Sequence, residues 1–217
     1  MRIKVCGITS VEQMQQLQAL GVEFAGLIFY EKSARYAGDK LQDHKEEIKH
    51  CAIRKVGVFV NAELETIRTA IADYGLSAVQ LHGDESAMLC KALMDEVHVI
   101  KVFRMGDEEE LHDRVVAFED ACHYYLFDTD TKGYGGSGRS FDWTVLERAQ
   151  VNKSFFLSGG IGPDDVEKIK AFKHPCLYAI DVNSRFETEP GLKNMDLLKH
   201  FVSELHASAV SDTTKEN

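Results

Sequence analysis

The sequence has no long apolar run, fewer basic than acidic residues and no paired-cysteine motif. No stretch is apolar for long enough to span a bilayer, and the start, Met1 to Cys6, is too short and too mixed for a signal peptide. The formal net charge of -10 argues against nucleic acid or an anionic membrane as the main partner, while leaving room for a local cationic pocket. We therefore expect a cytoplasmic protein with a small-molecule partner, no nucleic-acid partner and no membrane partner.

Motifs for metals and disulfides are missing too. The five cysteines are odd in number and scattered without a Cys-x-x-Cys pair, a usage typical of a reducing compartment. The nine histidines form no spaced metal motif. The sequence therefore predicts no metal site and no cofactor.

Short apolar runs alternate with helical stretches along the whole chain. Each of the predicted strands precedes a predicted helix, and Asn61 and Asp142 are predicted to cap two of these helices. The predicted strands cover residues 3–6, 24–29, 55–60, 78–81, 98–103, 124–128, 154–157 and 177–180. The predicted helices cover residues 12–20, 39–49, 63–74, 85–94, 107–118 and 142–149, a stretch that begins at Pro163, and residues 195–205.

This alternation predicts an α/β protein with one (β/α)8 TIM-barrel domain over residues 1–206 and a polar tail over residues 207–217. Strands of such a barrel are buried on both faces, which explains why the runs are continuously apolar. The competing fold is a doubly wound open sheet. It usually has fewer strands, and no Gly-x-Gly-x-x-Gly follows the first strand here.

Asp128 ends the sixth predicted strand and precedes four glycines between Gly133 and Gly138. Taken alone, this pattern fits a proton donor under a glycine-rich loop as well as a carboxylate that caps a turn. In a barrel, however, the carboxyl ends of all strands meet at the active site. Polar side chains gather at those ends, which favours the proton donor: Cys6, Arg35, Asn61, Gln80, His82, Lys101, Arg104, Asp128, Ser158, Asp181, Asn183 and Ser184.

Two loops indicate a phosphate site. Ser158-Gly159-Gly160 follows the seventh predicted strand, and Asn183-Ser184 follows the eighth. Barrels often bind phosphate with these two loops, through backbone N–H groups and the positive end of a short helix. The alternative interpretation of Ser-Gly-Gly is a tight turn.

Cys6 ends the first predicted strand, where a thiol is either a packed small residue or a reactive group. Cationic neighbours would lower its pKa, and Cys6 and Asp128 would then act as base and acid on opposite sides of a ligand. A nucleophilic Cys/His/Asp triad with His82 is the rival hypothesis, but it explains neither the phosphate loops nor the position of the acid. The other cysteines are predicted to be structural.

Several segments resemble the phosphoribosylanthranilate isomerase family, in register to about Leu198. The Cys-Gly-Ile-Thr start and the Gly-Gly-Ser-Gly loop are specific to that family among phosphate-binding barrels. The chain departs from the family's usual residues in Ser33-Ala34-Arg35 and after the eighth strand. The matching segments are Lys4–Thr9, Val56–Asn61, Val79–Asp84, Phe127–Asp128, Gly135–Gly138, Phe141–Trp143, Leu157–Ile161 and Asp181–Ser184, with Glu187, Pro190 and Gly191.

The resemblance implies an Amadori rearrangement in tryptophan biosynthesis, from N-(5-phosphoribosyl)anthranilate to 1-(2-carboxyphenylamino)-1-deoxyribulose 5-phosphate. It implies that Asp128 protonates the ribose ring oxygen and that Cys6 removes the proton from C2. Arg35 would bind the anthranilate carboxylate, and Asp181 would face its amine. The remaining expected ligand contacts are Gln80, His82 and Lys101 for the substrate, and Gly136, Gly159, Gly160, Asn183 and Ser184 for the phosphate.

Other functions stay open at this point. Another phosphosugar barrel is one alternative, but the metal ligands of a ribulose-phosphate epimerase and the N-terminal extension of an indole-glycerol-phosphate synthase are not found. A non-catalytic barrel that binds a phosphorylated metabolite is another, and the presence of both Cys6 and Asp128 speaks against it. The chain is expected to be a monomer or a homodimer.

Overall fold

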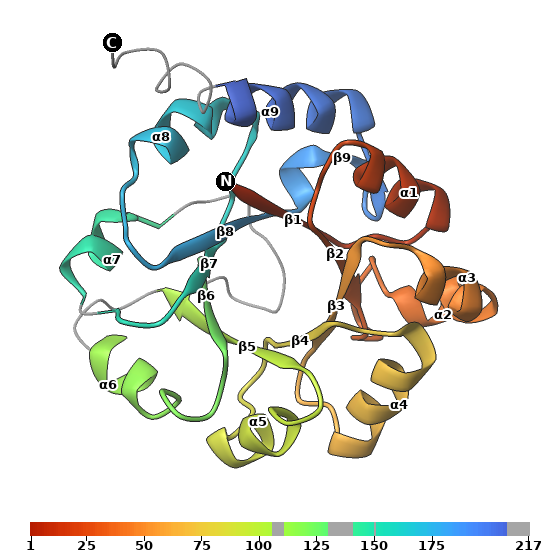
Figure 1. The fold of residues 1–217 in the computed structure, drawn as a ribbon, viewed down its shortest axis with the longest axis horizontal. Coiled ribbons are helices and arrows are strands. Elements are labelled where there is room, and N and C mark those ends of the chain that lie inside the picture. Colours follow the sequence, from red (N-terminus) through yellow and green to blue (C-terminus); the bar gives the residue numbers. More distant parts are fainter. Residues whose placement is uncertain (106–110, 130–140, 150, 208–217) are drawn as a thin grey trace, which may run out of the picture.

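Eight parallel strands close into a barrel in chain order, as a computed structural model of the protein shows (Figure 1). The structure describes residues 1–105, 111–129, 141–149 and 151–207. The predicted α/β TIM barrel is confirmed, whereas the predicted tail lies almost wholly outside the described residues. The barrel strands are β1 (Arg2–Cys6), β2 (Phe24–Ile28), β3 (Arg54–Phe59), β4 (Ala78–Leu81), β5 (His98–Met105), β6 (Tyr124–Thr129), β7 (Phe155–Leu157) and β8 (Leu177–Val182).

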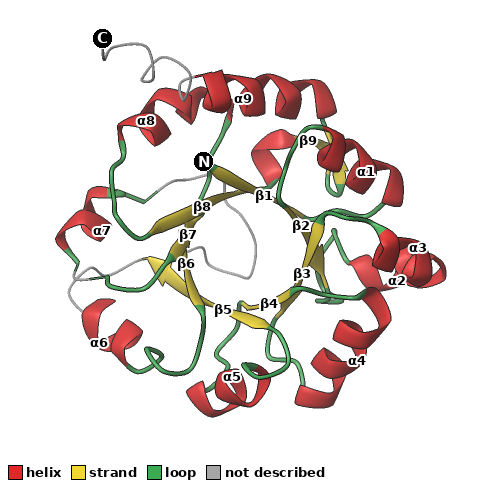
Figure 2. Ribbon diagram, viewed as in Figure 1, coloured by secondary structure: helices red, strands yellow, loops and turns green. Residues whose placement is uncertain are grey.

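The helices form a ring outside the strands, as Figure 2 shows. The predicted helix 39–49 is split into three short pieces. Only Leu41 and Ile48 of that range are buried, so little packing holds it as one helix. The helices are α1 (Val11–Ala19), α2 (Ala37–Leu41), η1 (Gln42–His44), α3 (Lys45–His50), α4 (Leu64–Tyr74), α5 (Ala87–Leu93), α6 (Leu111–Val116), α7 (Thr144–Arg148), η2 (Pro163–Asp165), α8 (Val166–Ala171), η3 (Ser184–Phe186) and α9 (Met195–Ala207).

Two predicted helix caps are wrong: Asn61 bonds a neighbouring loop, and Asp142 lies one residue before the N-cap of α7. Asn61 has a φ of 51°, and its Oδ1 accepts the backbone N–H of Asp84 at 2.7 Å, so it joins the loops after β3 and β4 instead of capping α4. The carboxylate of Asp142 accepts the N–H of Thr144 at 3.0 Å, but α7 begins one residue later than predicted, after Trp143.

A short hairpin between β8 and α9 was not predicted. It consists of β9 (Glu187–Glu189) and β10 (Leu192–Lys193), which pair antiparallel. Gly191 turns the chain between them with a φ of 87°, a conformation that glycine adopts without strain. The hairpin strands are too short to show an alternating pattern, which explains why the sequence gave no signal for them.

The amino-terminal end of the barrel interior is filled by side chains from the amino-terminal parts of the strands. Phe24 and Phe156 meet edge to face with ring centroids 5.5 Å apart, and Arg54 lies over the ring of Phe24 at 4.2 Å. Burial of these apolar side chains excludes water from that end. The open space of the barrel therefore lies at the carboxyl ends of the strands. The buried members of this cluster are Phe24, Val56, Ala78, Ile100, Val102, Leu126, Phe156 and Ala179.

A larger core lies between the strands and the surrounding helices. Leu17 of α1, Ile67 of α4 and Phe201 of α9 are almost fully buried in it. Among the described residues, no helix is long and apolar enough to cross a membrane.

Candidate active site

A cavity opens at the carboxyl ends of the strands, where the sequence predicted the site. Most of the predicted site residues line it: Cys6, Arg35, Gln80, His82, Asp128, Gly160, Asp181, Asn183 and Ser184. Tyr30, Lys32, Ser33, Ser158 and Arg185 line it as well. Within the described part of the chain, no group of three or more His, Cys, Asp or Glu side chains could hold a metal ion.

Cys6 occupies the end of β1 with its thiol buried. A Cβ on Gly26, its neighbour on β2, would come within 2.9 Å of the Cys6 sulfur, so glycine is needed there to make room for the thiol. Side chains two residues apart on a strand share a face, which places Lys4 below Cys6. The Nζ atom of Lys4 lies 2.9 Å from both carboxylate oxygens of Asp181 on β8. All three side chains are buried.

The pKa of the Cys6 thiol is raised, chiefly because burial disfavours the thiolate. The positive charges of Lys4 and Lys193 oppose this effect, and the negative charge of Asp181 adds to it. The expectation of a lowered pKa for Cys6 is therefore wrong for the ligand-free protein. Burial lowers the pKa of Lys4, but its ion pair with Asp181 and the charge of Cys6 outweigh that effect and raise it.

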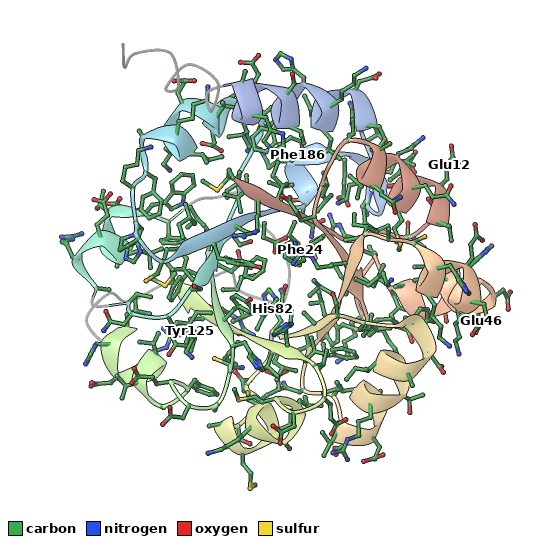
Figure 3. All side chains as sticks on the ribbon, in the orientation of Figure 1. Glu12, Phe24, Glu46, His82, Tyr125 and Phe186 are labelled. Carbon is green, nitrogen blue, oxygen red and sulfur yellow. The ribbon has the colours of Figure 1, made fainter. Side chains whose placement is uncertain are left out.

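A chain of polar contacts leads from Gln80 through His82 to Asp128. The Nε2 atom of Gln80 lies 2.9 Å from Nδ1 of His82. The Nε2 atom of His82 lies 3.4 Å from Oδ2 of Asp128, and Oδ1 of Asp128 accepts the backbone N–H of Thr129 at 2.9 Å. Figure 3 shows His82 inside the ring of strands. His82 therefore pairs with Asp128, while Cys6 neighbours Lys4 and Asp181, which does not support the triad hypothesis.

Arg35 makes a two-pronged ion pair with Glu187 at the start of the hairpin. Its Nε and Nη2 atoms lie 2.9 Å and 2.6 Å from the carboxylate oxygens of Glu187. Lys193 binds the same carboxylate at 2.7 Å and also donates to Oδ1 of Asn183 at 2.8 Å. Gly7 lies against this cluster, since a Cβ there would come within 2.7 Å of Cδ of Arg35. Two cations share one carboxylate, so the cluster carries positive charge beside the cavity.

The two predicted phosphate loops contribute Ser158, Gly160, Asn183 and Ser184 to the cavity lining. Gly159 and Gly160 have φ values of 94° and 71°, and a Cβ on Gly159 would come within 2.4 Å of Oγ1 of Thr129. These backbone conformations and this close approach require glycine. The second loop contains the start of the η3 turn at Ser184. Gly136 lies outside the described residues.

Gly159 and Lys101 are the predicted site residues of the described chain that do not line the cavity, and Lys101 lies in a buried ion pair instead. Its Nζ atom lies 2.8 Å from Oε2 of Glu85 and 2.8 Å from the carbonyl oxygen of Gly83, and both charged groups are buried. Glu85 also accepts the backbone N–H groups of Asn61 and Gly83. Lys101 therefore anchors the loop after β4, directly beyond His82.

Sequence reasoning gave no role to four of the charged residues of the site. Lys4, Glu187 and Lys193 are almost wholly buried in ion pairs, and Arg185 lines the cavity beside Ser184. The signal for Lys4 was its place two residues before Cys6 on one strand. The sequence held no comparable signal for Lys193, because the hairpin that carries it was not predicted.

Comparison with known proteins gives the family. The family described as N-(5'-phosphoribosyl)anthranilate (PRA) isomerase matches residues 3–204. The chain is a member of the phosphoribosylanthranilate isomerase family. It is therefore an isomerase of tryptophan biosynthesis, as its sequence predicted.

The chain matches known phosphoribosylanthranilate isomerases over almost its full length and theirs. The N-(5'-phosphoribosyl)anthranilate isomerase of Parabacteroides distasonis is 39% identical over 212 residues, 97% of this chain and 96% of that protein. The crystal structure of phosphoribosyl anthranilate isomerase from Thermotoga maritima has a TM-score of 0.81 and 34% identity, and it covers 95% of this chain and 98% of that one. A phosphoribosyl anthranilate isomerase in complex with reduced 1-(o-carboxyphenylamino)-1-deoxyribulose 5-phosphate has a TM-score of 0.78 and 31% identity, with coverage of 95% and 98%.

Proposed function

We propose that this cavity converts N-(5-phosphoribosyl)anthranilate to 1-(2-carboxyphenylamino)-1-deoxyribulose 5-phosphate, with Asp128 as general acid and Cys6 as general base. One observation carries the proposal: a thiol on β1 and a carboxyl group on β6 line the same cavity as residues of the loops that follow β7 and β8. An acid and a base on different walls can act on neighbouring atoms of a sugar that lies between them.

The first step opens the ribose ring. Asp128 gives its proton to the ring oxygen, the C1–O bond breaks, and the nitrogen lone pair forms the C=N bond of a Schiff base. Asp128 becomes a carboxylate in this step. Its Oδ1 already accepts a backbone N–H from Thr129, and its Oδ2 faces His82. Both contacts stabilise the charge that develops on Asp128.

In the second step Cys6 removes the proton from C2, and the electrons of that C–H bond form an enolamine. The enolamine becomes the ketone when C1 gains a proton and the C2 hydroxyl loses one. Cys6 must be a thiolate to act as this base. Lys4 and Lys193 supply positive charge beside it, and Lys4 is held in place by Asp181. No metal takes part in either step of this proposal.

The substrate has two anionic ends, and the cavity has a suitable group for each. Arg35, which is half-buried, would hold the anthranilate carboxylate with the part of its guanidinium that faces the cavity, while Glu187 fixes the other part. Asp181 would face the amine of the anthranilate. Backbone N–H groups of Gly159, Gly160 and Ser184 would hold the phosphate, with Asn183 and Gly136 close to it.

The proposal also covers the compartment and the oligomeric state of the enzyme. All five cysteines are free, which fits a reducing cytoplasm. The chain would work as a monomer or a homodimer. The second option is supported by a Thermotoga maritima relative that is described as a dimeric enzyme from which monomers were generated.

An enzyme-coupled assay tests the proposal. Anthranilate, phosphoribosyl pyrophosphate and the transferase that joins them would produce the substrate, and the loss of its fluorescence would report turnover. Cys6→Ser and Asp128→Asn keep the shapes of the side chains but remove the base and the acid. Each should lower kcat by about 10²-fold or more and leave substrate affinity within about tenfold. Cys51→Ser, at the outer end of α3, is the control and should stay near wild type. A Cys6→Ser enzyme that keeps most of its kcat would overturn the assignment of the base.

A further inference from the structure

Gln80 lies on the wall of the cavity with one end of its amide bonded and the other unpaired. The side chain is 1% exposed, and Nε2 lies 2.9 Å from Nδ1 of His82. The carbonyl oxygen Oε1 is buried and has no hydrogen-bond partner among the described residues. A buried carbonyl without a donor is costly, so such an atom marks a place where a ligand donor fits.

Hydrogen bonds hold the backbone of His82, and the contact with Gln80 restricts which nitrogen of its imidazole carries the proton. Its backbone N–H donates to the carbonyl of Phe59 at 2.9 Å, and its own carbonyl accepts Nη2 of Arg104 at 2.9 Å. When Nδ1 accepts the amide N–H of Gln80, the proton of the neutral ring must lie on Nε2. That nitrogen is the one that lies 3.4 Å from Oδ2 of Asp128. The orientation of the Gln80 amide thus decides whether His82 presents a donor to Asp128.

We propose that Gln80 is a positioning residue: its Oε1 accepts a hydrogen bond from a sugar hydroxyl of the bound substrate, and its N–H fixes His82 as a donor to Asp128. The proposal rests on the function given above and adds a link between substrate binding and the acid. The bonds run in one direction, from the sugar hydroxyl through Gln80 and His82 to Asp128. A bound hydroxyl would hold the amide in the orientation that this direction requires.

The link matters because Asp128 changes its charge during the reaction. As its O–H bond breaks and the O–H bond of the sugar forms, Oδ2 becomes a stronger acceptor, while His82 keeps its own proton. The bond from His82 is therefore stronger in the transition state than in the ground state, which is the condition for an interaction to accelerate the step. Asp181, the other carboxylate near His82 and Asp128, accepts from Lys4 with both of its oxygens.

Nitrogen NMR of the histidine rings tests the link without turnover. Long-range proton–nitrogen spectra of ¹⁵N-histidine-labelled enzyme show which ring nitrogen carries the proton, and His82→Asn identifies the signals of His82 by their loss. Spectra would be recorded for the free enzyme and with reduced 1-(o-carboxyphenylamino)-1-deoxyribulose 5-phosphate, between about pH 7 and pH 9, above the usual range of histidine titration. We expect the proton on Nε2 and none on Nδ1 in the complex. A proton on Nδ1 in the complex would overturn the proposal.

Two variants separate the contacts of Gln80. Gln80→Glu keeps an acceptor for the hydroxyl but has no N–H for His82, so we expect the His82 proton on Nδ1 and a kcat that is lowered about tenfold with KM within about threefold. Gln80→Met offers neither contact, so KM should also rise about fivefold. Gln16→Met on the exposed side of α1 is the control, and thermal unfolding checks that all variants fold.

The outcomes distinguish this proposal from the function on which it rests. A Gln80→Glu enzyme with the kcat of the wild type would overturn the positioning role, even if the isomerase reaction itself is observed. A wild-type enzyme that does not consume the substrate would count against the proposed function. The ring tautomer of His82 would still report independently on the contact with Gln80.

Discussion

Replacing Lys4 with methionine tests the buried ion pair beside Cys6. Lys4 is 0% exposed, and its Nζ lies 2.9 Å from both carboxylate oxygens of Asp181, which is 6% exposed. Methionine fills most of the space of the lysine stem but carries no charge. Asp181 would then be left buried without its partner, a change that typically costs about 3–5 kcal/mol. Because whole domains are stable by only about 5–15 kcal/mol, Lys4→Met should lower the free energy of unfolding by a large fraction.

A double-mutant cycle separates the ion pair from the loss of packing. Urea unfolding would be measured for Lys4→Met, Asp181→Asn and the double variant. The double variant leaves no unpaired charge, so its loss of stability should be smaller than the sum of the single losses. Lys45→Met is the control. Lys45 lies 2.6 Å from Asp73, but both side chains are more than one-third exposed, and such surface pairs contribute about 0–1 kcal/mol. A Lys4→Met protein that loses no more stability than Lys45→Met would refute the reasoning.

The pH dependence of the same variant has a definite sign. Burial raises the pKa of Asp181 even with Lys4 present, and without Lys4 the folded state should hold the proton to higher pH still. The unfolded chain releases that proton near pH ~3.9. A group whose pKa is raised in the folded state loses its contribution to stability as the pH rises. The deficit of Lys4→Met relative to wild type should therefore be small at about pH 4 and grow towards pH 8, which urea unfolding at several pH values can check.

Three further predictions follow from the site. Arg35→Ala should weaken substrate binding by about 1.5–3 kcal/mol and raise KM more than it lowers kcat. The control, Arg68→Ala in an exposed ion pair, should leave both constants unchanged. If Arg35→Ala and wild type have equal KM values in steady-state assays, Arg35 lies outside the substrate site. Gly159→Ala should unfold at lower temperature than Gly21→Ala, because both have positive φ values but only Gly159 meets an atom closer than 3.0 Å; equal melting temperatures would contradict the clash. Cys6 of the free enzyme should react slowly with iodoacetamide at pH 7 and faster as the pH rises, because burial raises the pKa of its thiol. Peptide mass spectrometry would measure the labelling, and fast labelling of Cys6 at pH 7 would contradict the raised pKa.

The barrel itself could be predicted well, because its signals are local. Each strand is a short apolar run, and the ends of β4 at Ala78 and Leu81 coincide with the prediction. Polar residues directly after such runs were predicted to converge, and Gln80, His82 and Asp128 do line one cavity. The rule behind that success is topological, since parallel strands bring their carboxyl ends to one face.

The charged partners of the site could not be predicted by the same means. Arg35 and Glu187 are 152 residues apart in sequence, and they meet because the hairpin after β8 lies against the segment between β2 and α2. Lys101 looked like a substrate contact from its place on β5, but Glu85, two residues after Gly83, takes its ammonium group. Periodicity reports which face of a strand is buried, and it does not report which buried charges find each other.

The raised pKa of Cys6 changes how the base has to work. In the free enzyme Cys6 is a thiol, yet it must be a thiolate when it takes the proton from C2. Among the described charged groups of the cluster around Cys6, Lys4, Lys193 and Arg35 are cations, and Asp181 and Glu187 are the carboxylates that bind them. The positive charges of Lys4 and Lys193 favour the thiolate, and each of these lysines is held in place by a carboxylate. Such charges act more strongly in a buried site than in water. The positive charge that stabilises the thiolate is therefore in place before Cys6 loses its proton, while the buried thiol of the resting enzyme stays unreactive towards oxidants.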